Sequence, residues 1–227
     1  MVSSNKSGKQ AVTRILIVDD HPLVRLSLRE FIRREKDLEV CGEAEDREQA
    51  LAAAESTKPH LAIIDLTLKS SNGMELIKDM RDRHPDVQIL VLSMHDETIH
   101  AERAIRAGAR GYITKQEATT KVMVAIRQIM NGEIYWSERA AARVASKIAG
   151  PARGVAESPV DCLTDRELQV FEMIGSGKST RQISASLHID VSTVETYRAR
   201  IKEKLNLKDS LALLQFAIRW QISNAQG

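Results

Sequence analysis

The chain has 227 residues, enough for two domains of ordinary size, and its hydrophobic (43%) and charged (28%) contents are normal for a soluble globular protein. Its 33 Lys and Arg nearly balance its 31 Asp and Glu, so any surface that binds nucleic acid must be a local patch. Two distant cysteines, without a CxxC or Cys/His cluster, argue against a disulfide framework and a structural zinc. No apolar run reaches membrane-spanning length and no signal-peptide pattern is present, so we expect a cytoplasmic protein with no membrane partner.

Short apolar runs alternate with helical patterns over the first half of the chain. Strands are predicted at residues 14–18, 38–44, 61–64, 88–92 and 111–114. A helix follows each strand, opening at about residues 22, 46, 74, 97 and 119, and a polar loop is predicted at 69–73. Five strands alternating with five helices indicate a doubly wound α/β domain, for which the flavodoxin-like strand order 2-1-3-4-5 is the natural candidate.

Four of these strands end, on their carboxyl side, in a chemically distinctive residue. These residues are the pair Asp19 and Asp20, then Asp65, Ser93 and Lys115. Each has an ordinary explanation when taken alone: a strand-end Asp or Ser often caps a turn, and a strand-end Lys is often solvated. Because the carboxyl ends of parallel strands meet at one edge of the sheet, we expect the four strand ends to form a single site.

This set of residues suits the binding and transfer of a phosphoryl group. Converging carboxylates repel one another unless a cation is present, and a hard divalent ion such as Mg²⁺ prefers oxygen ligands. Lys115 and Ser93 can stabilise phosphoryl oxygens by charge and by hydrogen bonding. Asp65 is then the best candidate for a covalent phosphoryl acceptor, since a carboxylate can act as a nucleophile.

Residues 13–132 resemble the receiver domain of two-component response regulators. The motifs that carry the resemblance are Val18-Asp19-Asp20-His21, Ile64-Asp65-Leu66, Leu92-Ser93 and Gly108-Ala109-Arg110-Gly111-Tyr112-Ile113-Thr114-Lys115. The resemblance implies that Asp65 takes a phosphoryl group from a partner histidine kinase. It also implies an Mg²⁺ site formed by Asp20, Asp65 and the backbone carbonyl of Thr67, with Asp19 helping through the water shell of the metal. Ser93 and Tyr112 would move together on phosphorylation.

Two positions near this site depart from the usual receiver pattern. Lys69 stands where many receivers have Pro, and Met94 follows the switch hydroxyl where a small residue is usual. A bulky Met94 could narrow access to the phosphoryl group. The rates of phosphorylation and dephosphorylation are therefore left open.

A helical segment and linker is predicted at residues 133–160. Ser137 is a suitable N-cap for an Ala-rich helix that runs to residue 148, and Gly150-Pro151 would terminate it. Residues 149–160 carry Gly, Pro, Ala and Ser without a period, so the domain boundary is expected there. Tyr135 and Trp136 are expected to pack the linker against the first domain.

Residues 161–227 are predicted to form a small all-α domain of four helices. Capping boxes open the first helix at Thr164 and the second at Ser179, and Asp190 is the expected N-cap of the third. The turn between the second and third helices is short, as in a helix-turn-helix. The fourth helix, from about Ser210 to Ile222, is apolar on more than one side and suggests a partner surface as well as core.

Helical geometry divides the third helix into two faces. At about 100° per residue, Val194, Tyr197, Ile201 and Leu205 point to the core. The opposite face combines short side chains with flanking charged groups, which suits a helix laid in the DNA major groove, although an ordinary solvated face is the alternative. The candidate DNA-binding residues are Ser192, Thr193, Glu195, Thr196, Ala199, Arg200 and Lys202.

This second domain resembles the four-helix LuxR-type DNA-binding domain over about residues 161–224. The resemblance rests on Leu163-Thr164-Asp165-Arg166-Glu167, Gly177-Lys178-Ser179, Thr193-Val194-Glu195-Thr196-Tyr197-Arg198 and Ile201-Lys202-Glu203-Lys204-Leu205. It implies groove contacts by Glu195, Thr196 and Ala199, and a dimerisation helix with Leu211, Leu214 and Ile218. Glu195, Tyr197 and Ser210 replace a common Lys, His and Arg, so the operator sequence of relatives does not transfer.

Together the two resemblances predict a response regulator of the NarL/FixJ class, which on phosphorylation binds a double-stranded operator as a homodimer. An aspartyl-phosphate phosphatase or transferase is disfavoured because Asp19 and Asp20 are adjacent rather than spaced as DxD, and nothing forms a substrate pocket. We therefore expect that the protein is not an enzyme, and that its only chemistry is Mg²⁺-dependent phosphorylation and dephosphorylation of its own Asp65. A DNA-binding protein whose receiver is a phosphorylation-independent dimer module remains the second alternative.

Overall fold

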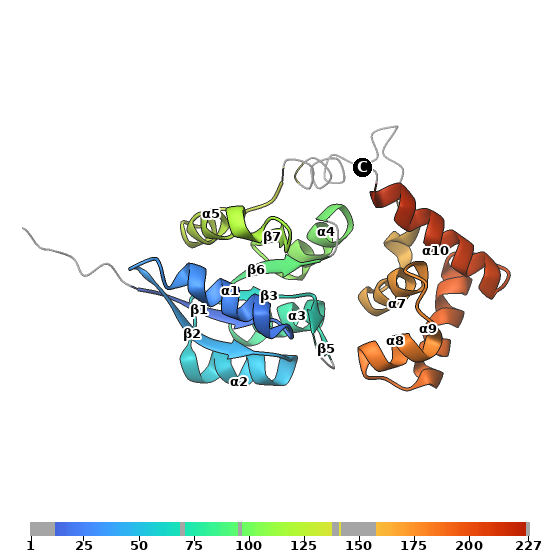
Figure 1. The fold of residues 1–227 in the computed structure, drawn as a ribbon, viewed down its shortest axis with the longest axis horizontal. Helices are drawn as coiled ribbons and strands as arrows, with labels where there is room; N and C mark the ends of the chain where they lie inside the picture. The colour runs from blue at the N-terminus through green and yellow to red at the C-terminus, as the bar shows by residue number, and fades with distance from the viewer. Residues whose placement is uncertain (1–11, 69–70, 95–96, 138–140, 142–157, 226–227) are drawn as a thin grey trace, which may run out of the picture.

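A computed structural model describes residues 12–68, 71–94, 97–137, 141 and 158–225. An α/β unit forms the N-terminal part and a helical unit the C-terminal part (Figure 1). The elements of the first unit are β1 (Thr13–Val18), α1 (Pro22–Ile32), β2 (Leu38–Ala44), α2 (Arg47–Thr57), β3 (Leu61–Ile64), β4 (Thr67–Leu68), β5 (Ser71–Asn72), α3 (Gly73–Arg83), β6 (Gln88–Ser93), α4 (Glu97–Ala107), β7 (Gly111–Thr114) and α5 (Ala118–Met130). Those of the second are η1 (Pro159–Cys162), α7 (Asp165–Gly175), α8 (Thr180–Leu187), α9 (Val191–Lys204) and α10 (Ser210–Ala225).

The main sheet has five parallel strands in the order β2-β1-β3-β6-β7. This confirms the flavodoxin-like order, because the extra strands β4 and β5 form a separate antiparallel pair. The predicted polar loop at 69–73 was wrong in part. Ser71 and Asn72 pair with Leu68 and Thr67, while Lys69 and Ser70 lie outside the described residues.

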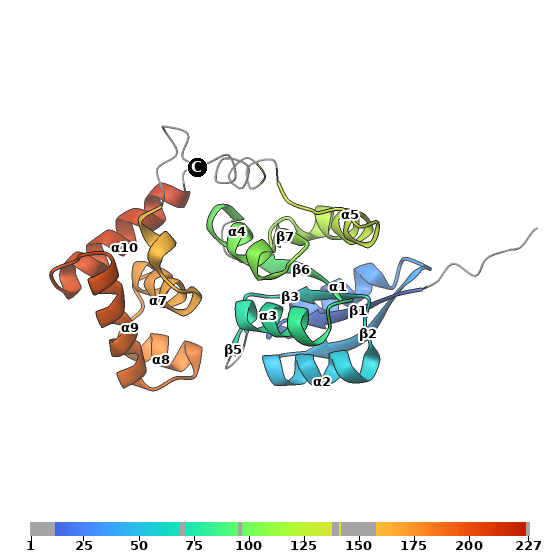
Figure 2. The same cartoon turned by 180° about the vertical axis from the view of Figure 1, so that it is seen from behind.

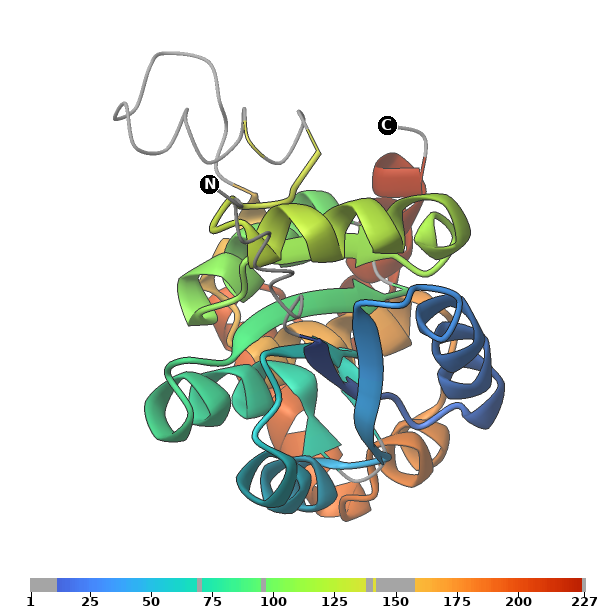
Figure 3. The same cartoon turned by 90° about the vertical axis from the view of Figure 1, so that its left-hand side faces the viewer.

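Helices cover both faces of the sheet, which Figure 3 shows end-on and Figure 2 from behind. Helices α1 and α5 pack on one face, and α2, α3 and α4 on the other. Alternate residues of β3 enter different clusters: Ala62 and Ile64 join the core under α2–α4, whereas Leu61 and Ile63 join the core under α1 and α5. A strand buried on both faces must be apolar throughout, which is why its sequence is a continuous apolar run.

Local signals in the sequence account for where several helices begin. Pro22 stands in the first turn of α1, where its missing N–H costs no hydrogen bond. Side chains of Asp46 and Asn72 accept hydrogen bonds from the backbone N–H groups of Gln49 and Met74. Such caps set the entry angle of α2 and α3 onto the sheet.

The C-terminal unit has its own core between α7, α8, α9 and α10. Phe171 is fully buried and meets Trp220 edge-on, with ring centroids 5.3 Å apart. Both predicted capping boxes, Thr164–Glu167 and Ser179–Gln182, are formed. The four-helix fold of this unit is confirmed; Asp190 is the N-cap of α9 but makes no side-chain capping bond.

The start of the linker is joined to the edge of the sheet. Tyr135 pairs with Gly111, and its carbonyl accepts a hydrogen bond from the backbone N–H of Tyr112 at 3.0 Å. Tyr135 and Trp136 pack against the two cores of the first unit, as expected. Most of the helix predicted at 137–148 lies outside the described residues, and the domain boundaries at 13–132, 133–160 and 161–227 stay a prediction.

Among the described residues, no helix has the length and apolar character that crossing a membrane requires.

Gly73 allows the closest backbone approach in the first unit. A Cβ built there would lie 2.1 Å from the Asp65 carbonyl oxygen and 2.6 Å from the Leu66 Cα. Both are backbone atoms, so relief of the clash would require α3 to move away from the end of β3. The glycine therefore positions α3 against the candidate site.

We expect Gly73→Ala to destabilise the fold by about 1–3 kcal/mol, the usual cost of overpacking a filled core. Urea unfolding followed by circular dichroism measures this difference. Gly132→Asn is the control, because nothing lies within 4 Å of a Cβ at Gly132 and Asn tolerates its positive φ. Equal stability of the Gly73→Ala and wild-type proteins would contradict the close approach.

Candidate functional site

The first part of the candidate site lies where β1 and β3 end side by side. Val18 is in register with Ile64, so Asp19 and Asp65 leave the sheet next to each other. The backbone N–H of Asp65 donates to the carbonyl of Val18 at 2.9 Å. Both carboxylates are only 2% exposed. The sheet register thus holds two acidic side chains together in a buried position.

Lys115 reaches the same place from the end of β7. Its backbone N–H donates to the carbonyl of Ser93 at 2.8 Å, which fixes the residue beside β6. Its Nζ lies 2.7 Å from Asp65 Oδ2 and 2.7 Å from Asp19 Oδ2. Strand ends that are far apart in the sequence therefore converge, as their chemistry had suggested.

The environment of Asp65 stabilises its protonated form more than water does. Burial, and to a smaller extent the nearby Asp19, raise the pKa of Asp65 to about 6. Lys115 and the backbone N–H of Thr67 lower the pKa but do not cancel the effect of burial. Burial lowers the pKa of Lys115, yet attraction to Asp65 and Asp19 outweighs it, so the pKa of Lys115 rises above its usual value and the ammonium stays charged.

One ligand atom from each of Asp19, Asp20, His21 and Asp65 lies within 4.8 Å of the others. Three carboxylates form an oxygen donor set that fits a hard divalent cation. His21 was not among the predicted site residues, although it follows the acid pair directly; its Nδ1 lies 2.6 Å from Asp20 Oδ1. The backbone N–H of Thr67 donates to Asp65 Oδ1 at 3.2 Å, while a role for the Thr67 carbonyl as a ligand stays a prediction.

The two predicted switch residues are buried on neighbouring strands. Ser93 ends β6 at 0% exposure, and Tyr112 in β7 is 1% exposed. Register places Tyr112 beside Val91 and Thr114 beside Ser93. Met94, in contrast, is 66% exposed at the rim. The structure thus brings Ser93, Asp65 and Lys115 to one sheet edge. Tyr112 lies in the core beneath that edge, two residues before the end of β7.

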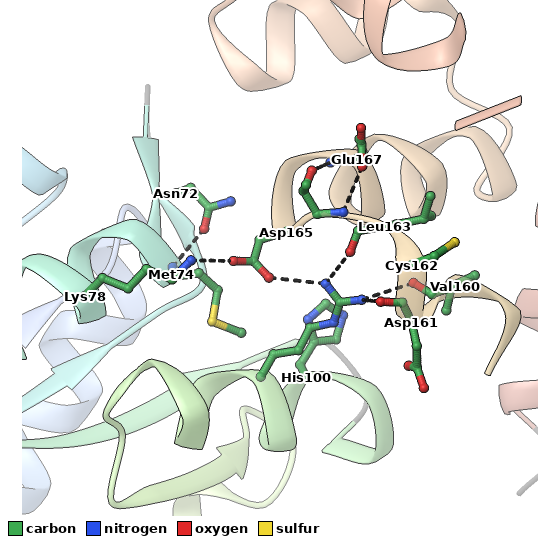
Figure 4. Close-up of polar contacts among 12 residues, drawn as sticks. Asn72, Met74, Lys78, His100, Val160, Asp161, Cys162, Leu163, Asp165 and Glu167 are labelled. Atoms are coloured by element: carbon green, nitrogen blue, oxygen red, sulfur yellow. Dashed lines mark hydrogen bonds and ion pairs between the residues drawn. The ribbon is translucent and has the colours of Figure 1, made fainter. Parts of the chain in front are cut away.

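The helical unit contacts the first unit through η1 and α7, which lie against α3 and α4 (Figure 4). Arg103 of α4 is the centre of this contact. Its Nη1 donates to the carbonyl of Leu163 at 2.8 Å, and its Nη2 donates to the carbonyl of Val160 at 3.0 Å. Asp165 lies between the units, 3.2 Å from Arg103 Nη1 and 3.0 Å from Lys78 Nζ.

A second polar contact joins α4 and α7 at a more buried place. His100 Nε2 lies 2.7 Å from Glu172 Oε1, and both residues are buried. They line a cavity of ≈ 20 Å³ together with residues of both units, about the room that one water molecule needs. None of these interdomain residues was predicted, because the pairing depends on how two separate domains dock.

The outer face of α9 is exposed to solvent over the residues that the structure describes. Ser192, Glu195, Thr196, Ala199 and Arg200 are exposed, whereas Val194 and Ile201 are buried in the helical core. Thr193 and Lys202 are partly exposed, and Tyr197 and Leu205 pack against the core as expected. The helix therefore presents the face that its periodicity predicts.

The three residues predicted for dimerisation differ in exposure. Leu211 is 62% and Ile218 38% exposed on α10, which leaves both available to a partner. Leu214 packs against the helical core. Ile222, which was not predicted, is 55% exposed and extends the apolar stripe of Leu211 and Ile218 by one turn.

Comparison with known families covers both units. The model of the response regulator receiver domain matches residues 15–127, and the model of bacterial regulatory proteins of the luxR family matches residues 161–217. The response regulator GacA of Pseudomonas viridiflava is 34% identical over 206 residues, which cover 91% of this chain and 95% of GacA. The response regulator UvrY of Escherichia coli (strain K12) is 32% identical over 212 residues, 93% of this chain and 96% of UvrY.

Solved structures agree with this assignment. The LuxR-family two-component response regulator of Aurantimonas sp. SI85-9A1 is 33% identical, with a TM-score of 0.56 over 61% of this chain and 99% of that one. The RcsB response regulator of Salmonella typhimurium, at 23% identity, shares the fold with a TM-score of 0.67 over 92% of this chain and 98% of its own. With a receiver unit, a helix-turn-helix unit and relatives above 30% identity over most of both chains, this protein belongs to the NarL/FixJ class of two-component response regulators and is a DNA-binding response regulator.

Proposed function

We propose that Asp65 accepts a phosphoryl group from the phosphohistidine of a partner kinase, and that this modification controls DNA binding. The observation that carries the proposal is the buried pairing of Asp65 with Lys115 at 2.7 Å, at the meeting point of four strand ends. An oxygen of Asp65 attacks phosphorus, and the histidine nitrogen of the kinase leaves. Lys115 and the hydroxyl of Ser93 stabilise the charge on the phosphoryl oxygens.

Magnesium is the cofactor that the acidic cluster fits best. Asp19, Asp20 and Asp65 supply oxygen ligands of the kind that Mg²⁺ prefers, and we also assign the carbonyl of Thr67 to this set. When bound, the ion adds positive charge beside phosphoryl oxygens. Its charge would also favour the ionised, nucleophilic form of Asp65, whose pKa is about 6 with Lys115 and Asp19 beside it.

Helix α4 packs in the same core as Tyr112 and also contacts the helical unit. Ser93 ends β6, and Val91, two residues earlier in this strand, lies beside Tyr112. Arg103 of α4 binds η1 and the start of α7 directly. We infer that phosphorylation shifts Ser93, Tyr112 and α4, and so weakens the interdomain contact. Because the outer face of α9 is exposed in the docked arrangement, release would realign the recognition helix rather than uncover it.

The released protein would bind a two-fold operator in double-stranded DNA as a homodimer. Leu211 and Ile218 form an exposed apolar stripe on α10 that suits self-association, with Leu214 closer to the core. The RcsB protein of Salmonella enterica has been solved bound to promoter DNA in the presence of the phosphomimetic BeF3⁻, which supports a link between the two activities. A kinase donor and a DNA target would place the protein in the cytoplasm.

Asp65→Asn should abolish Mg²⁺-dependent labelling by radioactive acetyl phosphate, because Asn cannot form the acyl phosphate. Asp82→Asn is the control: this carboxylate is exposed and lies away from the site. Labelling that survives in Asp65→Asn would contradict the assignment of the acceptor. If wild-type protein is labelled but binds DNA with the affinity of Asp65→Asn, the receiver is a phosphorylation-independent module.

Ala199→Glu should weaken specific DNA binding by at least about tenfold, because it adds bulk and negative charge on the face that approaches the phosphates. Ala52→Glu is the matched control, since it makes the same change at an exposed position of α2 in the receiver unit. Thr196→Ala should reduce binding more modestly, and labelling of Asp65 should be normal in all three variants. Footprints of normal strength from Ala199→Glu and Thr196→Ala would exclude this face as the DNA-binding surface.

Arg103→Ala should loosen the docked arrangement and tighten the binding of BeF3⁻ with Mg²⁺ by about fivefold or more, since the two equilibria are linked. Arg106→Ala is the control, because Arg106 lies on the same helix but pairs with Glu102 of that helix. Small-angle scattering reports the docking, and calorimetry reports the BeF3⁻ affinity. An unchanged affinity in a protein that scattering shows to be open would disprove the coupling.

A further inference from the structure

The recognition helix carries a carboxylate whose orientation is set by the preceding helix. Glu195 lies on the outer face of α9, and its side chain is 57% exposed. The hydroxyl of Thr180 donates to Glu195 Oε1 at 2.8 Å. Thr180 is the first residue of α8 and lies within the Ser179–Gln182 capping box, which fixes the position of its backbone. The position of the carboxylate therefore depends on the packing of α8 against α9.

A second neighbour attracts the other oxygen by charge, without a hydrogen bond from its Nε to that oxygen. Arg198 Nε lies 3.6 Å from Glu195 Oε2, one turn further along α9, and the Arg198 side chain is mostly buried. A carboxylate can accept about four hydrogen bonds, so these two neighbours leave acceptor capacity on the exposed side. A side chain held in this way gives up little conformational freedom when it meets DNA.

The chemistry of the major groove restricts what such a group can bind. A carboxylate only accepts hydrogen bonds, and the only donors on base edges in this groove are the N6 amine of adenine and the N4 amine of cytosine. The adenine amine lies between two acceptors, its own N7 and the O4 of the paired thymine, which repel a carboxylate. The cytosine amine has an acceptor on one side only, the O6 of the paired guanine, so cytosine is the better partner.

The negative charge of Glu195 lowers the free energy of binding that DNA can provide. A role for Glu195 in the structure alone would not recover this loss. Repulsion between Glu195 and the DNA phosphates lowers affinity for every sequence. A hydrogen bond to one base recovers free energy only on the correct sequence. An acidic residue at this position therefore lowers non-specific binding and increases discrimination.

We propose that Glu195, oriented by Thr180, is a specificity-determining residue that selects a cytosine in each operator half-site by accepting a hydrogen bond from its N4 amine. This inference rests on the proposed role of the outer face of α9 in groove binding. It assigns Thr180 as a positioning residue, which acts through Glu195 rather than on a base.

The test is selection from a pool of random double-stranded DNA with the full-length protein, treated with acetyl phosphate and Mg²⁺ at one fixed salt concentration. Wild type should enrich a two-fold motif with one half-site position at which cytosine is preferred by about tenfold. Glu195→Gln should lose this preference or exchange it for adenine, because an amide can pair with both N6 and N7 of adenine. The remaining positions of the motif should be unchanged.

Two matched variants separate base recognition from charge and from phosphate contact. Glu203→Gln removes the same charge from an exposed position of α9 and should retain the cytosine preference. Thr180→Val keeps the shape and charge of the site but removes the hydroxyl, and should reduce the preference severalfold. A Thr180 that contacted only phosphate would instead weaken binding to all sequences alike.

Each part of the inference has its own contrary result. Identical motifs from wild type and Glu195→Gln would overturn the role of Glu195, and a wild-type cytosine preference in Thr180→Val would overturn the role of Thr180. Loss of the preference in Glu203→Gln would show a general charge effect. If the wild-type protein enriches no motif at all, the proposed function fails rather than the choice of base.

Discussion

The contact of Lys115 with both Asp65 and Asp19 is the interaction on which the receiver site depends. It joins residues that follow three different strands, at 2.7 Å in each case, and all three side chains are buried. Without the ammonium, two buried carboxylates would face each other at close range, at a large cost in free energy. Burial raises the pKa of Asp65 to about 6 even beside Lys115, and a divalent cation would add positive charge that favours the ionised carboxylate.

The same sheet edge also determines where a signal can leave the receiver. Tyr112 is packed beneath the site, and the strand that carries it pairs with the start of the linker at Tyr135. Helix α4 meets the helical unit through His100 and Arg103. The docked face of α4 therefore offers one physical connection between the receiver and the helical unit.

Much of the site could be read from the sequence because parallel sheets impose a simple rule. Apolar runs such as Leu61–Ile64 identified buried strands, and their carboxyl ends had to lie at one edge. Helical periodicity likewise separated the buried Val194 and Ile201 from the exposed face of α9. These arguments need only local patterns and one topological rule. The short β4–β5 pair escaped prediction, because two-residue strands carry no periodic signal.

By itself, the sequence determined the element types, the strand order, the helix caps and the candidate residues Asp19, Asp20, Asp65, Ser93 and Lys115, since all depend on residue type and spacing. Only the tertiary structure decided how these parts meet. The close approach of Gly73 to the backbone of Asp65 and the hydrogen bonds of Arg103 to η1 each depend on distances between segments that are separated in the sequence. The hydrogen bond from Thr180 to Glu195 likewise depends on the tertiary structure. It arises from the packing of α8 on α9, which no sequence periodicity encodes.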